Sequence, residues 1–191
     1  MLGAYLKHCG LKARHSLKIG PKKLTPDWSV VGDKMTVKAI VELYSFHIDA
    51  INQNKIDQQL QTRLVATYHP DENISRDDRL YARLCEKADK YQSLAKEFEL
   101  PYVIAVFCTF EVAMDLNETK VCIFNEQRPF FEKYPEVSGM LHIEESGGTY
   151  IFNSIGNLKA QRPLELPNGR LYLSDAKSDL QMDFSSAGPI S

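Results

Sequence analysis

The sequence lacks the features that mark zinc ribbons, disulfide scaffolds and membrane proteins. Its four cysteines lie far apart with no CxxC pair, and its five histidines show no HExxH or similar spacing. These absences argue against a zinc ribbon and a dense disulfide framework. The longest apolar runs, such as YVIAVF at 102–107, are too short to span a bilayer. With no signal-peptide core at the N-terminus, we expect an intracellular, cytoplasmic protein without membrane contact.

A large net charge is also absent, since the formal charge is −2. The charges are unevenly distributed, however, because residues 1–38 hold eight Lys and Arg against two acids. A basic segment of this kind can face phosphates, or it can be a solvated edge. If it faces nucleic acid, we expect Lys22, Lys23 and Lys38 to make the contacts.

The apolar patterning predicts one α/β domain with a mixed sheet flanked by helices. We expect this domain to cover residues 1–175, followed by a polar, disordered tail at 176–191. The third strand should be central and covered by the strongest helix, at 77–99. The expected elements are a helix at 1–9, a strand at 12–19, a hairpin at 27–46 with its turn at GDK, a polar helix at about 49–64, a loop at 69–78, the helix at 77–99, a buried strand at 101–107, and a hairpin of 137–145 with 147–154.

Glu42 is unusual because it interrupts an apolar strand, VKAIVELYSF at 37–46. Its side chain should share one face with Ile40 and Tyr44 and be at least half buried, so it needs a partner. On the neighbouring strand Asp27 should lie across from residues 39 to 41, so the two carboxylates can approach each other. Such a pair suits a hard ion such as Mg²⁺. The alternative is a surface aspartate in a Pro-Asp turn and a glutamate paired with a lysine.

The segment TPDWSVVGDKMTVKAIVELYSFH, residues 25–47, resembles the PD-(D/E)xK nuclease superfamily, which has the restriction-endonuclease-like fold. There a hairpin carries Pro-Asp on one strand and (Asp/Glu)-x-Lys on the next. The resemblance covers about residues 1–155. DRLYARLCEKADKY, LPYVIAVF and YPEVSGMLHIEE are similar to segments of uncharacterised bacterial members.

The resemblance implies that Asp27 and Glu42 hold Mg²⁺ or Mn²⁺ and that a metal-activated water hydrolyses DNA. The expected partner is DNA, and a homodimer is compatible with the sequence. Since the chain starts late in the helix that precedes the first strand of this fold, we expect that helix to be incomplete.

The motif's lysine should stand at position 44, where this chain has Tyr44. Lys38 shares the strand face of Glu42 but lies roughly 13 Å away along the strand. On the helix at 77–99, at about 100° per residue, Lys87 falls inside the apolar sector and so points toward the sheet. Superfamily members can carry the lysine on this helix, so we predict that Lys87 completes the catalytic set with Asp27 and Glu42. The alternative is a lysine that snorkels to the sheet margin, with Tyr44 packing or adding its hydroxyl to the site.

Other assignments stay open at this point. His47 could act as a base near the metal, although a local contact at the strand end is the commoner role, as is helix capping for Asp49. Trp28 should lie on the opposite face from Asp27, in the core. Besides a nuclease, the sequence allows an impaired relative that binds nucleic acid or a protein, and a small-molecule-binding α/β domain.

Overall fold

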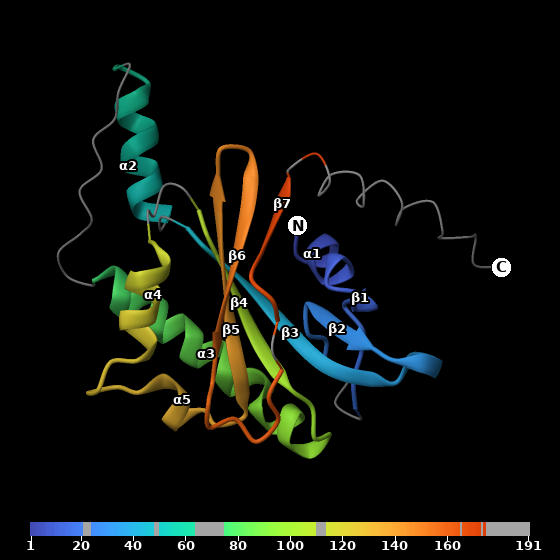
Figure 1. Cartoon of the computed structure of the whole chain (residues 1–191). Helices are drawn as coiled ribbons and strands as arrows, with labels where there is room; N and C mark the ends of the chain where they lie inside the picture. Colours follow the sequence, from blue (N-terminus) through green and yellow to red (C-terminus); the bar gives the residue numbers. More distant parts are fainter. Residues whose placement is uncertain are drawn as a thin grey trace.

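The computed structural model describes residues 1–20, 24–47, 50–63, 75–109, 114–164, 166–172 and 174. Its strands form one seven-stranded mixed sheet whose spatial order follows the sequence, β1-β2-β3-β4-β5-β6-β7 (Figure 1). The α/β class expected from the sequence is therefore confirmed. The elements are α1 (Leu2–His8), β1 (Ala13–His15), β2 (Trp28–Val31), η1 (Asp33–Met35), β3 (Val37–Phe46), α2 (Ala50–Leu60), α3 (Arg76–Glu97), β4 (Tyr102–Cys108), α4 (Leu116–Ile123), α5 (Phe130–Lys133), β5 (Val137–Ser146), β6 (Thr149–Gly156) and β7 (Gly169–Tyr172).

Three parallel strands, β3, β4 and β5, form the middle of the sheet, and antiparallel strands extend it on both sides. Parallel neighbours need a crossover, which α3 supplies between β3 and β4. β4 is buried along nearly its whole length, as its unbroken apolar run predicts. The strand with Glu42 is thus interior, but β4 rather than β3 occupies the middle position.

Each face of the sheet has its own apolar core. α3, α4 and α5 pack on one face, against residues that include Ile40, Ile104 and Met140. α1 packs on the other face, against residues that include Val41 and Leu141. Figure 1 shows α3 running across the sheet, α1 near the β1 edge, and α2 projecting away from the sheet. The alternation along β3 therefore follows the predicted period of two.

Both predicted hairpins are present. β5 and β6 are joined by Gly147 and Gly148, which both have positive φ, as a tight two-residue turn requires. β2 and β3 are joined through η1, where Lys34 and Met35 also adopt positive φ.

Some expectations were wrong. The strand expected at 12–19 is only three residues long, because Ser16 takes a positive φ and ends the extended conformation. Beyond it, Ile19 makes a single bridge with Leu24. α4, α5 and β7 were not predicted, although α4 begins with a capping box of Asp115 and Glu118, which is readable in the sequence.

Several predictions fall outside the described residues. These include Lys22 and Lys23, Asp49, residues 69–74 of the expected loop, and the tail at 176–191. Within the described part, none of the helices combines the length and the apolar composition that crossing a bilayer would require.

Candidate active site

Among the residues that the structure describes, Glu42 is the most deeply buried acid, with 1% of its surface exposed. It lies on the face of β3 that turns toward α3, between the buried Ile40 and the half-buried Tyr44. A carboxylate in such surroundings stays ionised only when charge and hydrogen bonds compensate its lost hydration.

Two lysines of α3 supply that compensation. The Nζ atom of Lys87 lies 2.7 Å from Oε1 of Glu42, and the Nζ atom of Lys90 lies 3.5 Å from the same oxygen. The Lys87 side chain is 24% exposed and that of Lys90 is 51% exposed. The prediction that Lys87 points toward the sheet is therefore confirmed, and the structure places its Nζ atom beside Glu42. Its catalytic role stays a prediction.

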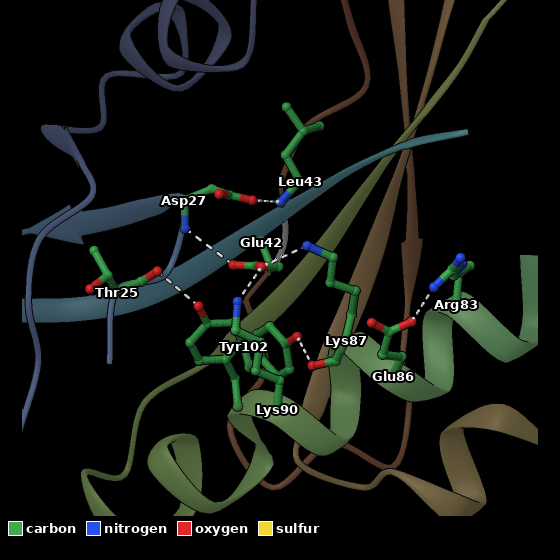
Figure 2. A network of polar contacts seen from close by, with 10 residues as sticks. Thr25, Asp27, Glu42, Leu43, Arg83, Glu86, Lys87, Lys90 and Tyr102 are labelled. Carbon is green, nitrogen blue, oxygen red and sulfur yellow. Dashed lines mark hydrogen bonds and ion pairs between the residues drawn. The ribbon is translucent and has the colours of Figure 1, made fainter. Parts of the chain in front are cut away.

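Asp27 meets Glu42 at the open end of the β2–β3 hairpin. Trp28 pairs with Val41, so the register places Asp27 across from Glu42 itself rather than across from residues 39 to 41. The backbone N–H of Asp27 donates to Oε2 of Glu42 at 3.1 Å, and Oδ2 of Asp27 accepts from the N–H of Leu43 at 2.8 Å. Figure 2 shows the backbone N–H of Asp27 and the ammonium groups of Lys87 and Lys90 around the Glu42 carboxylate, while the Asp27 carboxylate is directed at the N–H of Leu43.

Two tyrosine hydroxyls hold the elements that carry these groups. Tyr91 on α3 donates to the carbonyl oxygen of Thr25 at 2.8 Å and so fixes the segment that leads into Asp27. Tyr102 on β4 donates to the carbonyl oxygen of Lys87 at 2.8 Å and so ties α3 to the sheet (Figure 2). The positions of Asp27 and Lys87 thus depend on contacts between three separate elements.

The pKa values of Lys90 and Tyr102 are shifted in the directions that their contacts around Glu42 require. Contact with the Tyr91 side chain is the largest influence on the pKa of Lys90 and raises it, and the Glu42 carboxylate adds to the rise. Burial, followed by the charge of Glu42, raises the pKa of Tyr102 well above its usual value. Tyr102 is therefore a neutral donor, and Lys90 is a cation at neutral pH.

The carboxylate oxygens of Asp27 and Glu42 can supply only part of the ligand set of a hard divalent ion. Both oxygens of Glu42 already accept hydrogen bonds, but an ionised carboxylate offers about four lone-pair positions. Mg²⁺ commonly takes one or two carboxylates and completes its shell with waters and substrate oxygens. Among the described residues, no group of three or more His, Cys, Asp or Glu could hold a metal ion. Asp27 and Glu42 could therefore hold such an ion only together with water or substrate.

The remaining predicted residues lie around the site or away from it. Tyr44 packs on the core and its ring centroid lies 6.0 Å from that of Phe46, which agrees with a packing role. Lys38 is exposed, with its side chain against Gly32. His47 is exposed at the end of β3. Trp28 packs on the opposite face with α1, as predicted.

A cavity of about 460 Å³ lies elsewhere, between α5 and the end of β6. Its lining includes Phe124, Phe131, Leu158 and Lys159 but none of Asp27, Glu42 and Lys87. The charged cluster is therefore separate from this cavity.

Sequence reasoning missed three residues of the site. Lys90 was visible as a lysine at the edge of the apolar sector of α3. Tyr91 and Tyr102 looked like ordinary core aromatics, and nothing in the sequence indicates where their hydroxyls point.

Comparison with known proteins adds no identification. No family model, no curated protein and no solved structure matches this chain.

Proposed function

We propose that this chain is a metal-dependent nuclease of the PD-(D/E)xK type that hydrolyses DNA phosphodiester bonds with Mg²⁺ or Mn²⁺. One observation carries the proposal: the Nζ atom of Lys87 lies 2.7 Å from Glu42, whose neighbour across the hairpin is Asp27. These are the three groups that the motif requires, with the lysine supplied by α3 instead of position 44.

The order of the elements supports the proposal. α1 precedes three antiparallel strands, Asp27 directly precedes the second and Glu42 lies on the third, and the helices α2 and α3 then lead to the parallel strand β4. This is the arrangement that the resemblance to the restriction-endonuclease-like fold implies. The same topology can carry different chemistries, so the residues around Glu42 rather than the order of the elements support hydrolysis.

Each residue has a distinct role in this proposal. Asp27 and Glu42 hold the ion, and Lys87 orients the attacking water and offsets the charge that develops on the phosphate. A bound divalent ion lowers the pKa of its water and stabilises the same charge. Tyr91 and Tyr102 act through other groups, by holding Asp27 and Lys87 in place.

The balance of charged side chains in the site indicates under which conditions a divalent ion should bind there. Asp27 and Glu42 carry two negative charges, and Lys87 and Lys90 carry two positive charges. A divalent ion would leave an excess of positive charge, which the phosphates of a DNA strand would offset. We therefore expect tighter ion binding in the presence of DNA than in its absence.

The same balance favours a second candidate, a protein that binds nucleic acid without cutting it. Glu42 is compensated by Lys87, Lys90 and the N–H of Asp27 without a metal. A site of this kind could persist as a structural ion pair after catalysis was lost.

Cleavage of plasmid and single-stranded DNA in Mg²⁺ or Mn²⁺, compared with EDTA, tests the proposal. The variants are Glu42→Gln, which keeps the shape of the side chain, and Lys87→Met, which removes the charge. Lys96→Gln is the matched control, because it removes a charge from an exposed position of the same helix. We expect metal-dependent cleavage that falls at least about 100-fold in the first two variants and stays unchanged in the control.

Cleavage that persists in Glu42→Gln would come from a contaminant and would contradict the proposal. Metal-independent DNA binding without cleavage by the wild-type protein would favour the second candidate.

A further inference from the structure

Helix α3 carries a row of cations that continues beyond the candidate site. Its five members are spaced three or four residues apart: Arg76, Arg79, Arg83, Lys87 and Lys90. At about 100° per residue they fall within an arc of about 80°, and at 1.5 Å per residue they extend over about 21 Å. We call this row the α3 basic stripe.

The stripe follows β3 from Glu42 toward the carboxyl end of that strand. Lys87 and Lys90 contact Glu42, Arg83 interacts with the side chain of Tyr44, and the Arg79 guanidinium lies 4.6 Å from the centre of the Phe46 ring. Glu42, Tyr44 and Phe46 are successive residues on one face of β3. Each is therefore matched by a cation of the stripe.

Two arginines of the stripe, Arg76 and Arg83, can exchange their present acidic partners for another anion. Arg83 pairs with Glu86 and is 55% exposed, and Arg76 pairs with Glu118 and is 36% exposed. Ion pairs this open to water are weak. The fork of donors on an arginine also matches a phosphate well.

We infer that the α3 basic stripe binds the phosphate backbone of the DNA strand, on one side of the phosphodiester bond that is hydrolysed next to Glu42. This inference rests on the proposed function. One strand of duplex DNA has a phosphate every 3.4 Å or so along the axis, so about 21 Å matches roughly six phosphates. DNA suits the stripe better than a partner protein with an acidic surface does. Such a protein would place its carboxylates next to Asp27 and Glu42, which carry the same charge. A phosphodiester would instead approach these two residues together with a divalent ion.

Binding in EDTA tests the stripe independently of hydrolysis. Anisotropy of a fluorescent 20-nucleotide single strand and of its duplex would be measured at several NaCl concentrations. The variants are Arg83→Gln, Arg76→Gln and their combination, with Lys96→Gln as the control on the opposite side of α3. Arg79 is left in place because it packs on Phe46.

Each lost phosphate contact should lower the slope of log K against log salt by about 0.7 for the single strand and about 0.9 for the duplex. The double variant should lose about twice as much, and Lys96→Gln should keep the wild-type slope. Arg83→Lys, which retains the charge, should recover most of the slope lost in Arg83→Gln. Thermal unfolding of each variant confirms that the compared proteins are folded.

Equal slopes in the wild-type protein and the double variant would overturn the inference, as would a wild-type protein that binds neither DNA. If the wild-type protein cleaves DNA while the slopes are equal, only the stripe is contradicted. If the slopes fall as expected but no cleavage occurs, the stripe stands and hydrolysis is contradicted.

Discussion

Glu42 and His142 are both buried polar residues on the side of the sheet that faces α3 and α4, yet their surroundings differ. Glu42 meets two lysines whose side chains reach solvent. His142 on β5 is fully buried, with Nδ1 3.1 Å from the Thr119 hydroxyl of α4 and 3.9 Å from the Cys108 thiol. Its Nε2 makes no hydrogen bond and lies 3.8 Å from a Glu144 oxygen.

The energetic cost of burying a polar side chain is therefore offset in different ways at Glu42 and at His142. Glu42 can stay charged because cations compensate it and water is close to them. Burial lowers the pKa of His142, so this ring is held neutral. Burial also raises the pKa of the neighbouring Cys108 thiol to about 12, so that thiol is no nucleophile at neutral pH. A compensated charge beside solvent suits a reacting group, whereas a sealed neutral cluster suits a structural one.

The largest expected effect comes from removing the main compensating charge. Lys87→Met should lower the free energy of unfolding by about 3 kcal/mol, because it leaves the buried Glu42 with only the more distant Lys90. Adding Glu42→Gln in the same chain should recover much of that loss. Urea unfolding at neutral pH measures the loss and the recovery. A change under about 0.5 kcal/mol in Lys87→Met would contradict the view that Lys87 compensates the charge of the buried Glu42.

The second effect is a pH dependence that comes from His142. The unfolded chain binds a proton near pH 6.5, whereas the folded chain, with its lowered pKa, does so only at lower pH. Stability should therefore fall as the pH drops below about 6.5, by at most about 1.4 kcal/mol per pH unit. The decline stops below the folded pKa.

Unfolding of the wild-type protein and of His142→Leu at pH 7.5 and 5.0 measures this dependence. The stability of the variant should depend less on pH, whereas His15→Gln, at an exposed histidine, should behave like the wild-type protein. Identical pH dependence in the wild-type protein and His142→Leu would show that His142 is not held neutral by burial.

A third, smaller effect concerns the support of Asp27. Tyr91→Phe should cost about 1 kcal/mol, since it removes the hydrogen bond to the Thr25 carbonyl. Tyr134→Phe is the matched control, because that buried hydroxyl, near Cys85 and Asp89, makes no close hydrogen bond. Equal costs in the two variants, measured by thermal unfolding, would remove Tyr91 from the support of the site.

The smallest effect should come from Lys90. Its side chain is half exposed and lies 3.5 Å from Glu42, so Lys90→Gln should change stability by less than about 0.5 kcal/mol. A cost as large as that of Lys87→Met would mean that the two lysines share the compensation equally. Unfolding experiments on the two variants side by side distinguish these cases.

The sequence predicted most of the site because its features are periodic. The period of two along 37–46 placed Glu42, Tyr44 and Phe46 on one face, and the helical period placed Lys87 toward the sheet. Both periods follow from local backbone geometry, which needs no knowledge of the rest of the chain. The Pro-Asp segment and the hairpin turn placed Asp27 near Glu42.

The parts that were missed depend on local breaks or on packing between distant elements. The first strand ended early at the positive φ of Ser16, and α4 was missed despite its capping box. The register was misjudged because η1 and an irregularity between Val30 and Val31 change the pairing of the hairpin. A shift of this kind decides whether Asp27 faces Glu42 or a neighbour.

By itself the sequence determined the alternation of β3, the amphipathic face of α3 and the presence of one acidic residue in an apolar strand. Only the tertiary structure decided that Lys87 and Lys90 both reach Glu42, and that the hydroxyls of Tyr91 and Tyr102 hold the elements around it. The physical reason is that repeating backbone geometry sets the direction of a side chain within its own element. Distances between elements arise only when helices and strands pack.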